Sequence, residues 1–297
     1  MMEHGRPRSP VLGPGTAIDA LLTGLIDYAG LYPPASLDMR RAVGNYLAYR
    51  SGRHANLLGR FIVDIGRIDE LRAAAGNDLA HLKLSLIVPH NADGARLPAL
   101  LEEGMPIESL EMKTPDAHTP DFLLEKIPAH LETYIECPMD LMDGELFAPL
   151  AGSRARVKLR MGGVVPEAFP SPEAVARALD TLEHHKLSFK ATAGLHHPIR
   201  SCHRLTYAAD SPTGIMHGFV NLLAAAALIH FGGSATEAVQ ILEEPDAGAW
   251  TLSQDVLSWR SRRWTSDQLS EARKRFVSFG SCSFEEPIRD LEAMGWL

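Results

Sequence analysis

The sequence has few cysteines and no long hydrophobic run, and each shortage excludes a class of protein. Cys137, Cys202 and Cys282 are far apart and form no CxxC pair, so we expect neither a zinc ribbon nor a disulfide framework. The longest unbroken apolar run, residues 222–229, is much shorter than the roughly 20 residues that cross a bilayer. We therefore expect no membrane partner.

Positive charge is also scarce. The chain carries 29 Lys and Arg against 37 Asp and Glu, a formal net charge of −8. An acidic chain repels a phosphodiester backbone, so nucleic acid is not an expected partner. Residues 1–15 lack the apolar core of a signal peptide and are rich in Pro and Gly. They predict a flexible N-terminal arm, and we expect a cytoplasmic protein.

Several common catalytic signatures are missing as well. The chain contains no Walker A sequence, no G-x-G-x-x-G, no G-x-S-x-G and no H-E-x-x-H. These absences argue against the enzyme classes that depend on those motifs. Any function must therefore be inferred from less familiar combinations of residues.

A repeating β-then-α pattern is what the sequence does contain. The chain has 297 residues, 45% hydrophobic and 22% charged, an ordinary balance for a globular protein. Eight short β-like runs recur, most followed by a helix-like segment, and they cover residues 24–28, 60–65, 82–88, 107–113, 132–137, 154–161, 187–193 and 275–281. Eight such units predict an α/β fold, a TIM-like (β/α)8 barrel over residues 16–297, with a doubly wound open sheet as the alternative.

One interval interrupts the repeat. Residues 198–274 contain no convincing strand and three helix-like segments, at 217–231, 234–244 and 265–275. We interpret this interval as a helical insertion between the seventh and eighth strands. The first segment is too apolar to be exposed along its length, so it packs on the barrel or forms a homo-oligomer contact.

The strands carry charge on one face. Because side chains alternate along a strand, the apolar residues of each run face the helices and the charged ones face the barrel axis. Burying ions costs several kcal/mol each unless they are paired, so a substrate cavity or a structural ion-pair network is expected at the axis. The residues predicted to face it are Ser109, Glu111, Lys113, Glu132, Tyr134, Glu136, Arg156, Lys158, Arg160, Lys190 and Thr192.

Small residues follow two of these strands. Gly162 and Gly163 come directly after the cationic sixth run, and the eighth run ends at Gly280, Ser281 and Ser283. Glycine lets backbone N–H groups approach a phosphate or a carboxylate, and barrels often hold phosphate at the loops after strands seven and eight. Turn geometry alone would also explain these glycines.

The order of these motifs resembles class I aldolases of the deoxyribose-phosphate aldolase type. The matching strings are YIEC, VKLRMGG, FKATAGL and FGSCS, within residues 130–195 and 275–284. The resemblance implies that Lys158 forms a Schiff base and that Lys190 lowers its pKa. Arg160 departs from the family, which has a small polar residue there, and the insertion is not typical of it. The chain is also similar to a bacterial protein group sharing KATAGLHHP and FGSCSFEEP, which implies no activity.

The lysines suggest the same chemistry without the resemblance. A protonated lysine is no nucleophile, and a second cation within about 4–6 Å lowers its pKa. Lys158 has such neighbours if Arg156, Arg160 and Lys190 all point inward, and Glu111 and Glu136 could move protons. Lys190 is the second choice for the nucleophile.

Histidines offer a different hypothesis. His196 and His197 follow the seventh run, and adjacent histidines in a loop can share a divalent metal. Glu136 or Asp64 would then complete the ligand set. Alternatively, His196 reaches the substrate as an acid or base while His197 caps the turn, and no cofactor is needed.

These observations favour a carbon–carbon lyase, aldolase-like, acting on a small anionic carbonyl compound. The alternatives are a barrel phosphoribosyltransferase, a metal-dependent lyase or hydrolase, and a non-catalytic barrel that binds anions. Lys113, Arg156, Arg160 and Thr192 are the predicted anion-binding side chains, together with His196 and the small residues above.

Overall fold

Eight parallel strands close into one barrel, in the order β1-β13-β7-β6-β5-β4-β3-β2. The computed structural model describes residues 15–89, 92, 95–113, 127–137, 150–151 and 153–297, so all but the last residue of the predicted N-terminal arm lies outside it. The predicted (β/α)8 barrel is confirmed, and the open-sheet alternative is wrong. The strands are β1 (Ile26–Tyr28), β2 (Leu58–Asp64), β3 (Leu84–Val88), β4 (Ile107–Lys113), β5 (Glu132–Cys137), β6 (Ala155–Arg160), β7 (Phe189–Thr192) and β13 (Phe276–Ser281).

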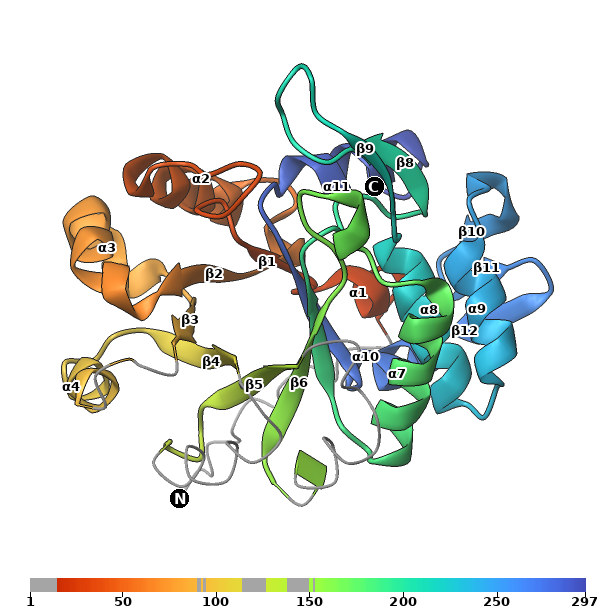
Figure 1. Ribbon diagram of the computed structural model, residues 1–297, viewed down its shortest axis with the longest axis horizontal. Coiled ribbons are helices and arrows are strands. Elements are labelled where there is room, and N and C mark those ends of the chain that lie inside the picture. The colour runs from red at the N-terminus through yellow and green to blue at the C-terminus, as the bar shows by residue number, and fades with distance from the viewer. Residues whose placement is uncertain (1–14, 90–91, 93–94, 114–126, 138–149, 152) are drawn as a thin grey trace, which may run out of the picture.

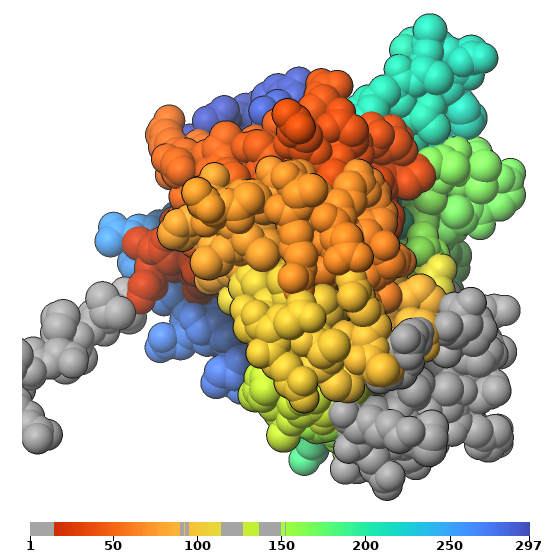
Figure 2. Space-filling model, turned by 90° about the vertical axis from the view of Figure 1, so that its left-hand side faces the viewer, coloured from red at the N-terminus to blue at the C-terminus, as the bar shows by residue number. Residues whose placement is uncertain are grey.

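Helices surround the barrel (Figure 1), and the chain's first third, in orange and yellow, forms the face seen in Figure 2. Sequence signals set several helix starts. The Ser171 hydroxyl accepts a hydrogen bond from the Ala174 N–H, with Pro172 following as the first helical residue. The helices are α1 (Ala17–Leu22), α2 (Met39–Ser51), α3 (Ile68–Ala75), α4 (Arg96–Glu102), α7 (Pro172–His184), α8 (Phe219–His230), α9 (Ala235–Glu243), α10 (Ser266–Arg273) and α11 (Glu285–Ala293).

The insertion between β7 and β13 holds the three predicted helices, α8, α9 and α10, but it is not purely helical. Two small antiparallel sheets accompany them, one of two strands and one of three. Their strands have only three or four residues, too few for an alternating pattern to be recognised in the sequence. They are β8 (Ser201–Arg204), β9 (Thr213–Met216), β10 (Trp250–Leu252), β11 (Val256–Trp259) and β12 (Arg262–Thr265).

Helix α8 is buried within a single copy of the chain. Every residue from Phe219 to Ile229 is buried, against α7, α9, α10 and β13. Intrachain packing therefore accounts for the apolar segment that suggested an oligomer contact. No helix among the described residues is long and apolar enough to span a bilayer.

Candidate functional site

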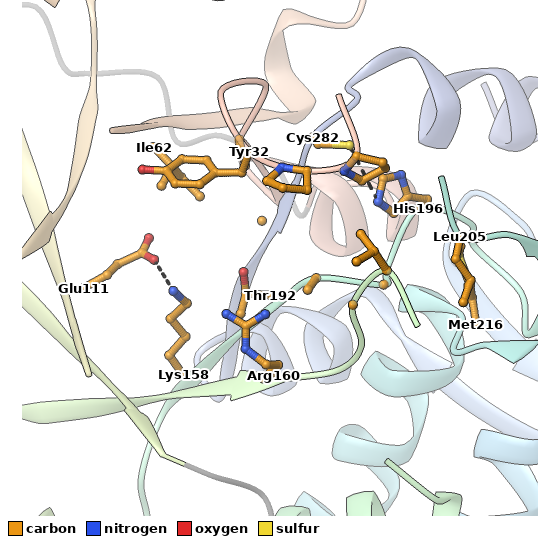
Figure 3. Close-up of a pocket in the computed structure, with 18 of the residues that line it drawn as sticks. Tyr32, Ile62, Glu111, Lys158, Arg160, Thr192, His196, Leu205, Met216 and Cys282 are labelled. Atoms are coloured by element: carbon orange, nitrogen blue, oxygen red, sulfur yellow. Dashed lines mark hydrogen bonds and ion pairs between the residues drawn. The ribbon is translucent and has the colours of Figure 1, made fainter. Parts of the chain in front are cut away.

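A cavity of about 290 Å³ opens at the carboxyl ends of the barrel strands. Its lining comes from the loop after β1, from β2, β3, β4, β6, β7 and β13, from the turns after β6 and β7, and from the β8–β9 hairpin (Figure 3). This is the end of the barrel where the sequence placed a site. The predicted residues that line the cavity are Glu111, Lys158, Arg160, Gly163, Thr192, His196 and Gly280.

Both predicted lysines point into the barrel and meet at one carboxylate. Lys158 Nζ lies 2.7 Å from Glu111 Oε2, and Lys190 Nζ lies 2.7 Å from Glu111 Oε1. Lys158 and Lys190 are register partners on the paired strands β6 and β7. The alternation predicted for β4, β6 and β7 is therefore confirmed at these positions.

Carboxylates surround the lysines, and this changes the expected electrostatics. Glu111 lies between the two ammonium groups, and Lys190 also donates to Asp27 Oδ2 at 2.5 Å. Burial lowers the pKa of Lys190, but the charges of Asp27 and Glu111 outweigh burial and raise it. Lys190 is thus held as a cation between two carboxylates. This does not favour its role as the second-choice nucleophile.

Glu111 is ionised for the same reason. Its side chain is almost fully buried, and the Ser85 hydroxyl donates to its Oε1 at 2.6 Å. Burial raises the pKa of Glu111, while the ammonium groups of Lys158 and Lys190 lower it by more. A buried carboxylate is therefore kept charged by two lysines, one of which lines the cavity.

Glu136 does not itself line the cavity but pairs with two cations that do, Lys158 and Arg160. Its Oε2 lies 2.8 Å from Lys158 Nζ, and its Oε1 accepts a hydrogen bond from Arg160 Nε at 2.9 Å. Burial raises the pKa of Glu136, but Lys158 and Arg160 lower it by more. Lys113 Nζ stands 3.9 Å from the same carboxylate, with its side chain 68% exposed.

Arg156 does not reach the cavity, contrary to the prediction of an anion-binding role. It pairs with Glu132 Oε1 at 2.7 Å and donates to the Tyr134 hydroxyl at 3.1 Å. Arg60 Nη2 holds the other oxygen of Glu132 at 2.9 Å. Because Arg156 and Glu132 lie at the amino ends of β6 and β5, these groups form a separate ion-pair layer away from the site.

Gly162 has a packing role that the sequence did not indicate. A Cβ there would lie 2.4 Å from Phe169 Cε1, and a Cβ on Gly194 would lie 2.6 Å from the same atom. Gly194 also has φ +68°, a conformation that side chains rarely adopt. The two turns after β6 and β7 therefore close around Phe169. Gly163 lines the cavity instead.

The predicted residues at the end of β13 and just after it divide into two groups. Gly280 lines the cavity, where a Cβ would meet Ile62 and Thr192. Ser281 donates to the Ser283 carbonyl at 2.6 Å, and the Ser283 hydroxyl accepts from the Glu286 N–H. The two serines thus shape the start of α11 and are not among the cavity's lining residues, unlike the prediction.

The two histidines do not converge on one point. His196 Nδ1 lies 2.7 Å from Glu286 Oε2, and His197 Nδ1 lies 2.6 Å from Asp290 Oδ2. The His197 ring stacks on His203 at 3.4 Å. Among the residues that the structure describes, no group of three His, Cys, Asp or Glu side chains could hold a metal ion.

Several site residues escaped the sequence reasoning. Asp27 lies in a mostly apolar run, and its buried pairing with Lys190 follows only from barrel closure between β1 and β13. Tyr32 lines the cavity, and its buried hydroxyl has no hydrogen-bond partner among the residues that the structure describes. Cys282 also lines it, beside His196. Alternation from the end of β13 was the signal that could have found Cys282.

Comparisons with known proteins add little beyond the fold. No protein-family model matches the chain, and no curated protein matches it. FabK from Thermotoga maritima is similar in structure, with a TM-score of 0.35, 13% identity, and coverage of 62% of this chain and 55% of that one. A single-substitution mutant of FabK gives a TM-score of 0.42 and 11% identity over 94% and 97% of the two chains. These likenesses are too distant to indicate a reaction.

Proposed function

We propose that this protein is an aldolase-like carbon–carbon lyase that uses Lys158 as a Schiff-base nucleophile. One observation supports this choice above others. Of the two buried lysines, Lys158 lines the cavity, with a carboxylate against it on each side. Lys190 is fully buried behind it and is not among the lining residues. Among the described residues, a carbonyl compound in the cavity therefore meets one lysine amine.

The adjacent carboxylates give Lys158 a route to its reactive form. An ammonium group must lose a proton before it can attack a carbonyl carbon. Glu136 lies 2.8 Å from Lys158 Nζ, close enough to accept that proton directly. The amine then adds to the carbonyl carbon and passes one proton to the carbonyl oxygen. Glu136 returns its proton to the departing hydroxyl, so that a protonated imine and water form. Lys190 keeps Glu111 ionised throughout.

Carbon–carbon cleavage follows from the imine. The iminium nitrogen accepts the electron pair of the breaking bond, while a base removes the proton from the substrate's hydroxyl group. Glu111 and Glu136 are the carboxylates available at this end of the cavity. The carbonyl fragment formed by the cleavage leaves, and the enamine that remains bonded to Lys158 is protonated at carbon. Water then hydrolyses the resulting iminium, which releases the second product and restores Lys158 as the amine.

Two features favour a substrate with an anionic group. Arg160 lines the cavity, and its side chain remains 45% exposed while holding Glu136. Its other N–H groups can therefore bind a carboxylate or a phosphate. The unpartnered Tyr32 hydroxyl offers a further hydrogen bond to a substrate oxygen.

Reductive trapping tests the proposal. The protein would be treated with borohydride and a panel of small anionic carbonyl compounds, beginning with pyruvate and dihydroxyacetone phosphate. We expect a covalent adduct on Lys158, located by peptide mass spectrometry, and none in Lys158→Arg, which keeps the charge but forms no imine. Lys113→Arg is the matched control and should still be trapped. Anion binding without any adduct would instead support the non-catalytic barrel.

A further inference from the structure

A second chemical cluster lies on the cavity wall away from the lysines. Cys282 Sγ is 3.9 Å from His196 Nε2, and His196 Nδ1 is 2.7 Å from Glu286 Oε2. The three side chains thus stand in the order nucleophile, base and orienting carboxylate. Figure 3 shows Cys282 and His196 at the opposite side of the cavity from Glu111 and Lys158.

The fold holds this cluster firmly. Cys282 directly follows β13, His196 lies in the turn region after β7, and Glu286 is in the first turn of α11. Cys282 is 5% exposed and His196 is 7% exposed. The Ser283 hydroxyl accepts from the Glu286 N–H, which fixes the start of α11. The β8–β9 hairpin supplies Tyr207, whose hydroxyl is 3.8 Å from Cys282 Sγ.

The surroundings favour a charged pair. Burial lowers the pKa of His196, but Cys282 and Glu286 outweigh it and raise the pKa to about 10. His196 is therefore an imidazolium at neutral pH, the partner that stabilises a thiolate. The other titratable groups that face the cluster are Tyr28, His197, His203 and Tyr207.

We propose that Cys282, His196 and Glu286 form a nucleophilic triad that accepts an acyl group from a small anionic acyl compound bound in the cavity. This activity goes beyond the lyase reaction and does not depend on it. The site belongs to the same cavity as Arg160, whose free N–H groups can hold the substrate's carboxylate or phosphate. A cavity of about 290 Å³ limits the substrate to a small molecule.

The chemistry balances with water as the co-reactant. The thiolate of Cys282 bonds to the acyl carbon, and the leaving group departs with the proton of the His196 imidazolium. Neutral His196 then removes a proton from water, whose oxygen bonds to the acyl carbon and breaks the C–S bond. The products are the free acid and the original thiolate–imidazolium pair. Glu286 keeps His196 oriented and stabilises its charge.

Alkylation by iodoacetamide, followed residue by residue with mass spectrometry, tests the ion pair. A thiol without an imidazolium partner loses about tenfold in rate per pH unit below its pKa, which is ordinarily about 8.5. We expect His196→Ala to slow the alkylation of Cys282 at neutral pH, while the exposed Cys202 reacts equally fast in both proteins and serves as the internal control. Equal rates at Cys282 in the wild type and in His196→Ala would overturn the proposal.

Acylation tests the reaction itself, with 4-nitrophenyl hydrogen succinate as the anionic probe and 4-nitrophenyl acetate as the neutral one. We expect a burst of nitrophenolate and a succinyl adduct on Cys282 of the wild-type protein. His196→Ala should slow the burst about 100-fold or more, the usual size of a general-base effect. His230→Ala is the matched control, because His230 also pairs with a glutamate, Glu183, but does not line the cavity.

The outcomes separate this proposal from the lyase. No burst and no adduct on wild-type Cys282 would overturn the triad, whatever the borohydride experiment finds at Lys158. A burst that is equally fast with both probes would overturn the anionic substrate class. An adduct on Cys282 without any trapping at Lys158 would support the triad and reject the Schiff-base lyase.

Discussion

Two glutamates on the inward face of β5 show how similar residues acquire different roles. Glu132 at the amino end is held by Arg60 and Arg156, and Glu136 at the carboxyl end is held by Lys158 and Arg160. Burial alone would raise the pKa of both carboxylates. The neighbouring cations have the larger effect, so both pKa values are lowered.

The difference lies in the cations and in what they border. Arginine stays charged in proteins, so the arginines around Glu132 can hold its carboxylate in place but cannot exchange protons. Lysine can give up its proton, and Lys158 borders the cavity. The amino-end layer is therefore structural, and the carboxyl-end layer has the means to exchange protons with a substrate. The site is defined by a lysine at an open end of the barrel rather than by charge alone.

The largest effect on stability should come from removing Lys190, the fully buried cation beneath the cavity. Lys190→Met leaves Asp27 and Glu111 as buried carboxylates that each lose a partner. We expect the free energy of unfolding to fall by about 3–5 kcal/mol, as when one member of a buried pair is deleted. Urea unfolding at pH 7 measures it. A loss below about 1 kcal/mol would show that Lys190 does not hold the carboxylates together.

Acid should weaken the carboxyl-end layer next. Glutamates with a folded-state pKa below the unfolded value of about 4.3 stabilise the fold above that pH and lose this contribution as pH falls further. Glu111 and Glu136 both have lowered pKa values. We expect the free energy of unfolding to drop by about 2–3 kcal/mol for one such group between pH 5 and pH 2.

Urea unfolding from pH 7 down to pH 2 checks this dependence. Glu136→Gln cannot titrate, so its stability should change less steeply with pH than that of the wild type. Identical slopes in the two proteins would mean that other carboxylates carry the acid sensitivity.

The arginine layer should respond in stability alone. Arg156→Met removes a partner of Glu132, but Arg60 still holds that carboxylate, and the Arg156 side chain is 31% exposed. We expect a loss of about 1 kcal/mol. The yield of borohydride trapping at Lys158 should match the wild type. Reduced trapping in a variant that unfolds like the wild type would place Arg156 in the substrate's path.

Most of the frame could be predicted from the sequence because strand repeats and alternation are local. The strand that bears Lys158 was identified to within one residue at each end, and its charged face does point to the axis. Ser171 with Pro172 marked the start of α7 for the same local reason. Such signals depend on neighbouring residues and need no knowledge of the closed barrel.

The ion pairs between strands could not be predicted, because they depend on how the barrel closes. Nothing near Asp27 in sequence shows that it meets Lys190, 163 residues away. Glu111 lies between Lys158 and Lys190, so the barrel interior holds alternating charges where the sequence suggested neighbouring cations. The role of Gly162 also depended on a contact that no local pattern marks, because its missing side chain leaves room for the ring of Phe169.

The smallest effect should come from removing Lys113, an exposed cation at the end of β4. Lys113 and Lys158 pair with the same carboxylate, so the two lysines can be compared directly. Lys113 and Lys158 both face Glu136, at 3.9 Å and 2.8 Å, but the Lys113 side chain is 68% exposed and that of Lys158 is 6% exposed. Water screens the Lys113 pair, so Lys113→Met should change the free energy of unfolding by no more than about 0.5 kcal/mol. Urea unfolding and borohydride trapping together check this, and both should match the wild type. If Lys113→Met instead destabilised the fold as much as Lys190→Met, solvent exposure would not determine how much a lysine contributes to stability. The distinction between structural and substrate-accessible charges would then fail.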